Sequence, residues 1–458
     1  MALGALSSLG AGSNGTLSYD IIDKLKSADI NAMVSPVDRK ISKTKDKENA
    51  LDSITTLTAT LKTTVVDLAD DTFYEKRKVS VNGKDVSVKS NDGVATQDIE
   101  MTVSQLAKID INQSKGFDSE TSSVTDRDTS MTIDIDGNSY DIDVSAGTTL
   151  EELKDKINES TEGKVVASIL NTGGNEPYSL ILKSAETGAN QAISVSYGDT
   201  DGDGTSNESP DDDFLDLTNV QSAQDAKFKF NGVDITRSTN EVTDLIVGVT
   251  FNLKGESGEK NSIFIKQDIE GIADMVEEFV SSYNSWRSKI EDVTKYDPDG
   301  KSTGVFMGDS TMRRLHLDVR YAVLNSEVDG KGLANYGMDI SKDGIMSFKR
   351  DEFIKVFKDN PQEAVKVFTQ EAGGVFSTLN SALKKATDPN NGYLKNYEDE
   401  LKRDRDRLSE EREKTMQMLD ARYEIMALQF AAYDEMISSM NISYQSLQMQ
   451  IDTQLAKK

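Results

Sequence analysis

The chain has 458 residues, and its 79 Asp and Glu against 52 Lys and Arg give a formal net charge of −27. This acidity excludes a nucleic-acid binder that relies on clustered cations, because backbone phosphates would repel a chain that lacks a locally basic domain. There is no Cys and only one His, so disulfides, thiolate zinc sites, Cys nucleophiles and polyhistidine metal sites are excluded as well. No apolar run reaches the roughly 18 residues of a membrane-spanning helix, and we expect no membrane insertion.

Residues 1–40 are predicted to form a disordered or helical leader that pairs with the C-terminal end of the chain. Its first part, residues 1–16, carries Leu3, Leu6 and Leu9 without a basic segment, which does not fit a cleaved secretory signal peptide. This pattern leaves open export through a route that reads an unfolded N-terminus.

A helical leg domain is predicted from two separate segments, residues 41–76 and 269–415. In each segment apolar residues recur at steps of three and four, which is the period of a helix with one buried face. The first segment contributes Leu51, Ile54, Leu57, Leu61, Val65 and Leu68. The second contributes a predicted leg core of Ile269, Ile272, Val276, Phe279, Tyr283, Trp286, Ile290 and Val293. Because Tyr283 and Trp286 fall on this periodic face, we interpret them as core side chains and not as a platform for a ligand.

Between these segments, from about residue 77 to 267, the apolar period changes to two, which predicts β-strands. Asn-Gly and Asp-Gly turns predict hairpins over residues 78–88, 131–144 and 228–235. One helix is expected among the strands, because Thr148 and Thr149 each precede a Glu by three residues in the form of a capping box.

Helices at both ends of a β-rich middle predict an α+β multidomain protein, with a helical coiled-coil leg built from both termini and two nested, inserted β-rich head domains. Ser, Thr, Asp and Gly are concentrated in residues 116–128 and 198–213, as in linkers or long loops. The first head domain is therefore expected to comprise residues 77–116 and 226–268, with residues 117–225 inserted as the second. This second domain is acidic, with 24 Asp and Glu against 5 Lys and Arg.

Residues 416–458 are predicted to form a separate C-terminal coiled-coil helix, because apolar residues recur there at alternating steps of four and three over five heptads. This seam, which is also the predicted oligomer contact, consists of Leu419, Tyr423, Met426, Phe430, Tyr433, Ile437, Met440, Tyr444, Leu447 and Ile451. Its Met, Tyr and Phe content favours irregular or changing partners. Two interpretations stay open. The seam either becomes ordered only against neighbouring chains, or it forms an intramolecular coiled coil with Leu17, Ile21, Ile22 and Leu25.

One acidic segment has part of the spacing of a calcium loop. Asp199, Asp201 and Asp203 occupy positions 1, 3 and 5, where such loops place oxygen ligands. Pro210 stands where the loop needs a bidentate acid, so these residues are only a weak calcium candidate, and a flexible acidic loop is the alternative. Elsewhere we expect no metal site and no bound cofactor.

An enzyme is the rival class, and glycoside hydrolysis would need only two suitably spaced carboxylates. The sequence has no aromatic-rich sugar groove and no GxGxxG, P-loop or GxSxG pattern. His316 could act as a general base with Asp318 or Ser310, but a single His on a predicted helix is more often a packing or surface residue. We therefore expect no catalytic residues and no enzymatic activity.

Several segments resemble, in their order and spacing, the bacterial flagellar filament cap (FliD, hook-associated protein 2) family. These segments are MTVSQLAKIDINQSKGF at 101–117, LIVGVTFNL at 245–253, FVSSYNSW at 279–286, GVFMGDSTMRRL at 304–315, LANYGMDISKDGIMSF at 333–348 and DNPQEAVKVF at 359–368. Residues 131–195 also resemble a small domain repeated in several flagellar filament proteins. The resemblance covers nearly the whole chain, although no single motif is diagnostic.

The resemblance implies a structural cap at the distal tip of the flagellar filament, which promotes folding and insertion of exported flagellin subunits and prevents their loss. The implied partners are further copies of the chain in a ring, flagellin, hook-filament junction proteins, and the flagellar export apparatus or a chaperone. A pentamer is expected, although rings of four or six copies also fit one seam per subunit. The implied location is extracellular, after export by the flagellar type III route without a cleaved signal peptide. The alternative is an extracellular adhesin or another axial structural protein of the flagellum.

Overall fold

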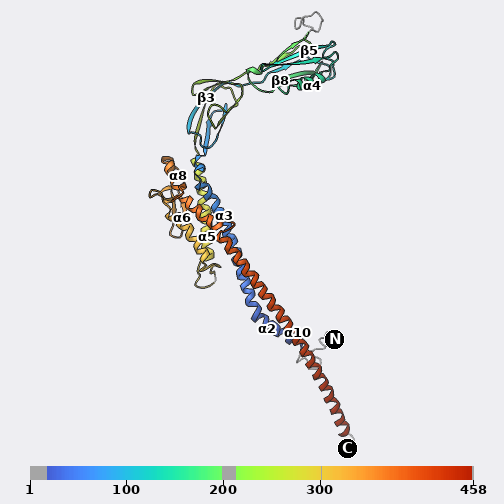
Figure 1. Ribbon diagram of the computed structural model, residues 1–458, viewed down its shortest axis with the longest axis vertical. Coiled ribbons are helices and arrows are strands. Elements are labelled where there is room, and N and C mark those ends of the chain that lie inside the picture. The colour runs from blue at the N-terminus through green and yellow to red at the C-terminus, as the bar shows by residue number, and fades with distance from the viewer. Residues whose placement is uncertain (1–17, 199–212, 301, 456–458) are drawn as a thin grey trace. The chain divides into compact units, whose positions relative to one another are not determined.

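The computed structural model describes residues 18–198, 213–300 and 302–455 (Figure 1). The chain divides into two compact units, one formed by Met1–Asp71 with Ile269–Lys458 and the other by Thr72–Asp268. The first unit is mainly helical and the second is built from β-sheets with helix α4 among them. The expected α+β class, with β domains inserted into a helical region, is confirmed.

The helical unit takes its elements from both ends of the chain. They are α2 (Tyr19–Asp29), the π-helical segment η1 (Ile30–Val34), α3 (Ser35–Ala69), α5 (Ile269–Thr294), α6 (Ser310–Asn325), η4 (Leu333–Tyr336), β16 (Met338–Ile340), β17 (Met346–Phe348), α7 (Arg350–Asp359), α8 (Pro361–Thr369), α9 (Val375–Thr387) and α10 (Tyr393–Leu455). Helix α3 packs against α5, α9 and α10, so the segments before and after the inserted β domains share one core.

Aromatic side chains fill much of this core. The ring of Phe376 lies 5.0 Å from that of Phe279 and 5.2 Å from that of Phe368, measured between ring centroids. All predicted leg-core residues of α5 are buried except Ile269, which is half-buried. Trp286 is 1% exposed and therefore acts as a packing residue, which leaves no aromatic platform for a ligand on this helix.

The first β domain of the second unit consists of two sheets around one apolar core. The larger sheet has the order β1-β15-β3-β11-β12, and the smaller has the order β13-β14-β2. Their strands are β1 (Arg77–Asn82), β2 (Val86–Ser90), β3 (Gln97–Gln105), β11 (Ala226–Phe230), β12 (Val233–Arg237), β13 (Glu241–Val242), β14 (Val249–Leu253) and β15 (Lys260–Gln267). The short helix η2 (Asp71–Glu75) precedes β1 in the sequence.

The predicted hairpin over residues 78–88 is wrong, because β1 pairs with β15 whereas β2 pairs with β14 in the other sheet. At the turn between them, Gly83 has φ +149°, and a Cβ there would lie 2.0 Å from the side-chain oxygen of Asn261. The same oxygen accepts a hydrogen bond from the backbone N–H of Asp85 at 3.1 Å. This long-range contact turns the chain from one sheet to the other instead of back on itself.

The second β domain also has two sheets, β10-β4-β8-β7 and β6-β5-β9, with helix α4 packed on β6 and β7. Its elements are β4 (Ile111–Gln113), β5 (Thr129–Ile135), β6 (Asn138–Val144), α4 (Leu150–Ser160), β7 (Val165–Asn171), β8 (Tyr178–Ser184), η3 (Ala189–Gln191), β9 (Ser194–Tyr197) and β10 (Thr218–Gln221). Leu150, Leu153 and Ile157 of α4 are fully buried in the core between these elements.

The other turn and cap signals that the sequence shows in this unit are confirmed. The predicted hairpins over residues 131–144 and 228–235 are formed by β5 with β6 and by β11 with β12. Thr149 closes the capping box of α4, because its hydroxyl accepts from the backbone of Glu152 while the Glu152 carboxylate accepts from the backbone of Thr149.

At three of the predicted domain boundaries, near residues 40, 116 and 416, the structure shows no domain boundary at that position. Helix α10 continues without a break through residue 416, and residue 40 lies inside α3. Strand β4, which precedes residue 116, pairs with β8 in the sheet of the inserted domain. The inserted domain therefore starts with β4, close to residue 110.

Candidate functional site

Helices α2 and α10 pack side by side, which brings together segments from the two ends of the chain (Figure 1). A small apolar cluster joins them, in which Ile22 of α2 and Val34 of η1 are buried against α10. The residues of α10 in this cluster are Leu419, Tyr423 and Ala427, spaced by four so that they share one helix face.

Polar contacts flank this cluster and fix how α2 lies along α10. The Lys26 ammonium lies 2.7 Å from the Asp420 carboxylate. The Asp29 carboxylate accepts a hydrogen bond from the Tyr423 hydroxyl at 2.8 Å and pairs with Arg422 at 3.2 Å. Because exposed ion pairs contribute at most about 1 kcal/mol each, the apolar cluster supplies most of the stabilisation and the charges set the register.

The chain's own N-terminal helices cover the first part of the predicted seam, up to Phe430. Met426 and Phe430 pack partly against the apolar cluster. Of the residues expected to pair from the N-terminal side, Ile22 is buried, Ile21 is half-buried and Leu25 is 43% exposed. Leu17 lies outside the described residues. Intramolecular pairing therefore accounts for this part of the seam only.

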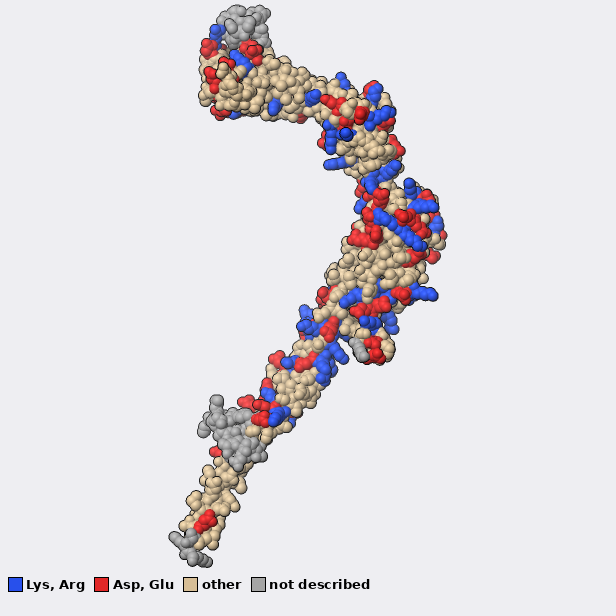
Figure 2. All heavy atoms as spheres, turned by 180° about the vertical axis from the view of Figure 1, so that it is seen from behind, with Lys and Arg blue, Asp and Glu red and all other residues tan. Residues whose placement is uncertain are grey.

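Beyond residue 430 the seam is largely exposed, and we call residues 433–455 the distal seam. Ile437 is half-buried, whereas the other seam positions there are exposed: Tyr433 by 56%, Met440 by 66%, Tyr444 by 69%, Leu447 by 60% and Ile451 by 51%. Asp452 is the only charged residue between positions 436 and 455, and the face drawn in Figure 2 shows this end of α10 almost without charge. A helix that is both uncharged and apolar along one stripe is typical of a surface covered by another chain.

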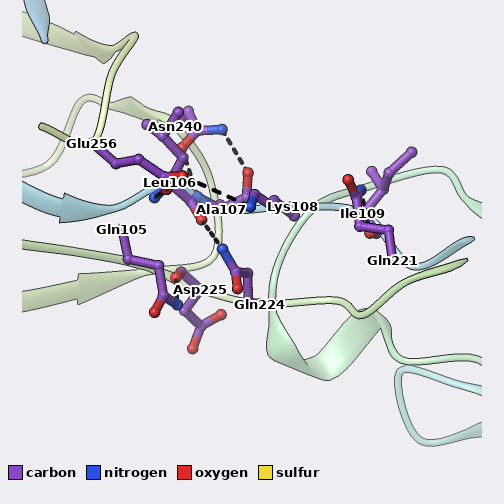
Figure 3. Close-up of polar contacts among 10 residues, drawn as sticks. All are labelled: Gln105, Leu106, Ala107, Lys108, Ile109, Gln221, Gln224, Asp225, Asn240 and Glu256. Atoms are coloured by element: carbon purple, nitrogen blue, oxygen red, sulfur yellow. Dashed lines mark hydrogen bonds and ion pairs between the residues drawn. The ribbon is translucent and has the colours of Figure 1, made fainter. Parts of the chain in front are cut away.

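In the second unit, two chain segments connect the two β domains, residues 105–109 leading out and residues 221–225 leading back (Figure 3). They run antiparallel, and the backbones of Lys108 and Gln224 bond to each other in both directions, at 2.9 and 3.2 Å. This crossing lies between the ends of the sheets, so most of its backbone groups need partners other than sheet neighbours.

Side chains supply those partners (Figure 3). The Asn240 amide accepts from the N–H of Ala107 and donates to its carbonyl, both at 2.8 Å. The Gln224 amide donates to the Leu106 carbonyl at 2.8 Å, and the Glu256 carboxylate accepts from the Leu106 N–H at 3.0 Å. With these bonds, the backbone N–H and carbonyl groups of both Leu106 and Ala107 have side-chain partners.

Asp110 anchors the far side of the crossing and is only 2% exposed. Its carboxylate accepts hydrogen bonds from the backbone N–H groups of Ile193 at 2.8 Å and Ala223 at 3.0 Å. It also accepts from the side-chain amides of Asn112 at 2.9 Å and Asn219 at 3.0 Å. The sequence gives no signal for this role, because the two backbone donors lie 83 and 113 positions away along the chain.

Among the residues that the structure describes, no group of three His, Asp or Glu side chains is arranged to hold a metal ion. The weak calcium candidate formed by Asp199, Asp201 and Asp203 lies outside the described residues. In that same described part of the chain, none of the helices has the length and apolar character needed to span a bilayer.

His316 lies half-buried on α6, and its imidazole makes no hydrogen bond with Asp318 or Ser310 in the described structure. Asp318 instead accepts from the Tyr393 hydroxyl at 3.4 Å and pairs with Arg314 at 3.7 Å. The three residues considered as a possible general-base group are thus not brought together.

Comparisons with known proteins agree on one family. The family model for the N-terminus of flagellar hook-associated protein 2 matches residues 14–110, the model for its C-terminus matches residues 223–442, and the flagellin hook IN motif matches residues 130–186. A flagellar hook-associated protein 2 from Helicobacter pylori is 26% identical over 100% of both chains. One from Campylobacter jejuni is 32% identical over 81% of this chain and 65% of its own length.

Among solved structures, the D1-D2-D3 domains of the flagellar cap protein FliD from Escherichia coli match with a TM-score of 0.58 and 23% identity. That match covers 77% of this chain and 99% of the other, and it shows a shared fold. The family models that match both ends of the chain and the inserted domain add sequence evidence for the family to this likeness in fold. The chain therefore belongs to the flagellar hook-associated protein 2 family, whose members are structural cap proteins of the bacterial flagellar filament.

Proposed function

We propose that this chain forms an oligomeric cap at the distal tip of the flagellar filament, where it promotes folding and insertion of exported flagellin and prevents loss of the subunits. The observation that supports this proposal most is the distal seam, which is exposed and almost uncharged. Burying a Leu, Ile or Met side chain stabilises by roughly 1.5–3 kcal/mol, so burial of Met440, Leu447 and Ile451 together with the Tyr side chains beside them would give a partner helix a strong contact.

The partners that fit this stripe are helices with an apolar stripe of their own. Further copies of the chain meet that requirement, because each brings the same seam, and a closed ring would use it in every subunit. Five copies are the expected stoichiometry. Helical ends of flagellin are the second partner, and the Met and Tyr side chains of the seam suit a contact that changes as subunits are added.

The proposal extends to the location and the route of export. It includes an extracellular position at the filament tip, export by the flagellar type III apparatus without a cleaved signal peptide, and contacts with an export chaperone and hook-filament junction proteins. Membership in the family supports these parts.

The test uses a bacterium that makes the matching flagellin but lacks its own filament cap, complemented with this chain. We expect the unaltered chain to give full-length filaments. A variant in which Met440, Tyr444, Leu447 and Ile451 are all changed to Ser is expected to give short filaments and flagellin in the medium. The matched control changes Gln445 and Gln448, which are exposed on the same turns, to Ala and is expected to behave like the unaltered chain. Full-length filaments with the Ser variant would contradict the proposal.

A further inference from the structure

A small hollow in the helical unit lies between α5, α6 and the turn that joins β16 to β17. Its volume is about 300 Å³. Side chains from all three elements line it, among them Tyr283, Arg287, His316, Arg320, Leu324 and Lys342. None of these residues belongs to the distal seam or to the crossing between the β domains.

The walls of the hollow are fixed by hydrogen bonds. The Asn284 amide of α5 accepts from the N–H of Met346 and donates to its carbonyl, both at 2.8 Å, which docks the hairpin on the helix. Arg287 donates to the carbonyl of Asp343 in the turn at 3.2 Å. A Cβ at Gly344, whose φ is +79°, would lie 2.7 Å from the Arg287 side chain, so the turn packs directly on the guanidinium. The hollow therefore exists before any ligand arrives.

The charge lining the hollow is positive and only partly neutralised. Arg287 pairs with Glu291 at 3.2 Å. Arg320 and Lys342 make no side-chain hydrogen bond or ion pair within the described part of the chain, and both are exposed. In a chain of net charge −27, cations that face one hollow without acidic partners indicate an anionic ligand.

One side of the hollow is apolar. Leu324 and Ile340 contribute to its wall. On the same helix, Leu317 is 52% and Tyr321 63% exposed, and their positions seven and three residues before Leu324 place them on the same helix face as Leu324. A small inorganic anion would gain no binding energy from this apolar wall, whereas a peptide can pack an apolar side chain on it.

We propose that this hollow binds an acidic side chain of another polypeptide, with an apolar residue beside it that packs on α6. The Arg320 guanidinium and the Lys342 ammonium contact the carboxylate, whereas Arg287, paired with Glu291, holds the turn in place. Leu317, Tyr321 and Leu324 receive the apolar neighbour.

The chain's single histidine makes the test direct. His316 borders the hollow, and the groups that act on its imidazole are Arg287, Arg320 and Glu291. In the intact protein labelled with 13C-histidine, the ε1 carbon–proton signal of His316 is followed during titration with the blocked peptide acetyl-Glu-Leu-Glu-Leu-amide. A saturable shift and a rise in the His316 pKa are expected, because a bound carboxylate favours the imidazolium ion.

Variants separate binding from general charge effects. Arg320→Gln is expected to weaken peptide binding by at least about fivefold, the loss that corresponds to about 1 kcal/mol for one charged contact. Arg313→Gln makes the same change on the same helix at an exposed residue that does not line the hollow, and it should leave binding unchanged.

Four results would overturn the proposal. They are no saturable shift with the acidic peptide, an equal shift with the Gln-Leu-Gln-Leu counterpart, an equal loss of binding in both Arg variants, or a shift with inorganic phosphate that the peptide does not produce.

Discussion

The indole N–H of Trp286 donates a hydrogen bond to the hydroxyl of Thr58 at 3.1 Å, between helices α5 and α3. The two residues are 228 positions apart, and both side chains are fully buried. Thr58 in turn donates its proton to the carbonyl of Ile54 at 2.7 Å. Within the helical unit, this hydrogen bond therefore joins the segment before the β domains to the segment after them.

Replacing Thr58 by Val tests this bond, because Val keeps the shape of Thr and removes the acceptor. The buried indole N–H would then lack a partner, which costs about 1–3 kcal/mol in the free energy of unfolding. Urea denaturation followed by the fluorescence of Trp286, the only Trp in the chain, reports on this unit directly. Thr58→Ser keeps the acceptor and should cost less. A Val variant as stable as the unaltered chain would show that the hydrogen bond contributes nothing.

The crossing between the β domains gives a second prediction. Asn240→Ala removes both hydrogen bonds to Ala107 and is expected to destabilise the second unit by about 1–3 kcal/mol. Hydrogen exchange measured by mass spectrometry should become faster over residues 105–109. The matched control is Asn175→Ala, an exposed Asn in a loop of the same unit whose side chain makes no hydrogen bond among the described residues. Equal exchange rates in the two variants would mean that Asn240 does not stiffen the crossing.

The stability of the helical unit should depend on pH through His316. Burial lowers the pKa of His316 below its usual value of 6.5, and the nearby cations Arg287 and Arg320 add to this effect. Below about pH 6.5, His316 binds a proton in the unfolded chain, whereas in the folded chain it does so only at lower pH. His316 therefore lowers the free energy of unfolding as the pH falls.

His316→Gln removes that penalty. Relative to the unaltered chain, the variant should gain in free energy of unfolding between about pH 7.5 and pH 5, as measured by urea denaturation at both values. A difference between the two proteins that stays constant over this range, or that favours the unaltered chain at the lower pH, would argue against a depressed pKa.

The sequence predicts those parts of the fold that depend on residues close together along the chain, such as helix faces and tight turns. The three-and-four spacing marks the buried face of α5, and Asn231 with Gly232 marks a hairpin that forms. The pattern around Gly83 fails because Asn261, far along the chain, redirects the turn. The bonds of the crossing are equally non-local, so neither Asn240 nor Asp110 stands out in the sequence.

The C-terminal seam illustrates the same limit. Its heptads are visible in the sequence, but the spacing alone does not indicate which half is covered within the chain. Leu419 is buried because Ile22 and Val34 of the N-terminal helices reach it. Leu447 lies farther along α10, where the described N-terminal residues form no cluster with it, and stays 60% exposed.

The mass of the intact protein in solution tests the central claim most directly, namely that the distal seam assembles the cap. Mass photometry of the unaltered chain should give a multiple of 50.3 kDa, and five copies are expected. The variant with Ser at Met440, Tyr444, Leu447 and Ile451 should give 50.3 kDa, with the helical content of the unaltered chain. An oligomer of unchanged mass in that variant, or an unaltered chain that remains monomeric, would contradict the account.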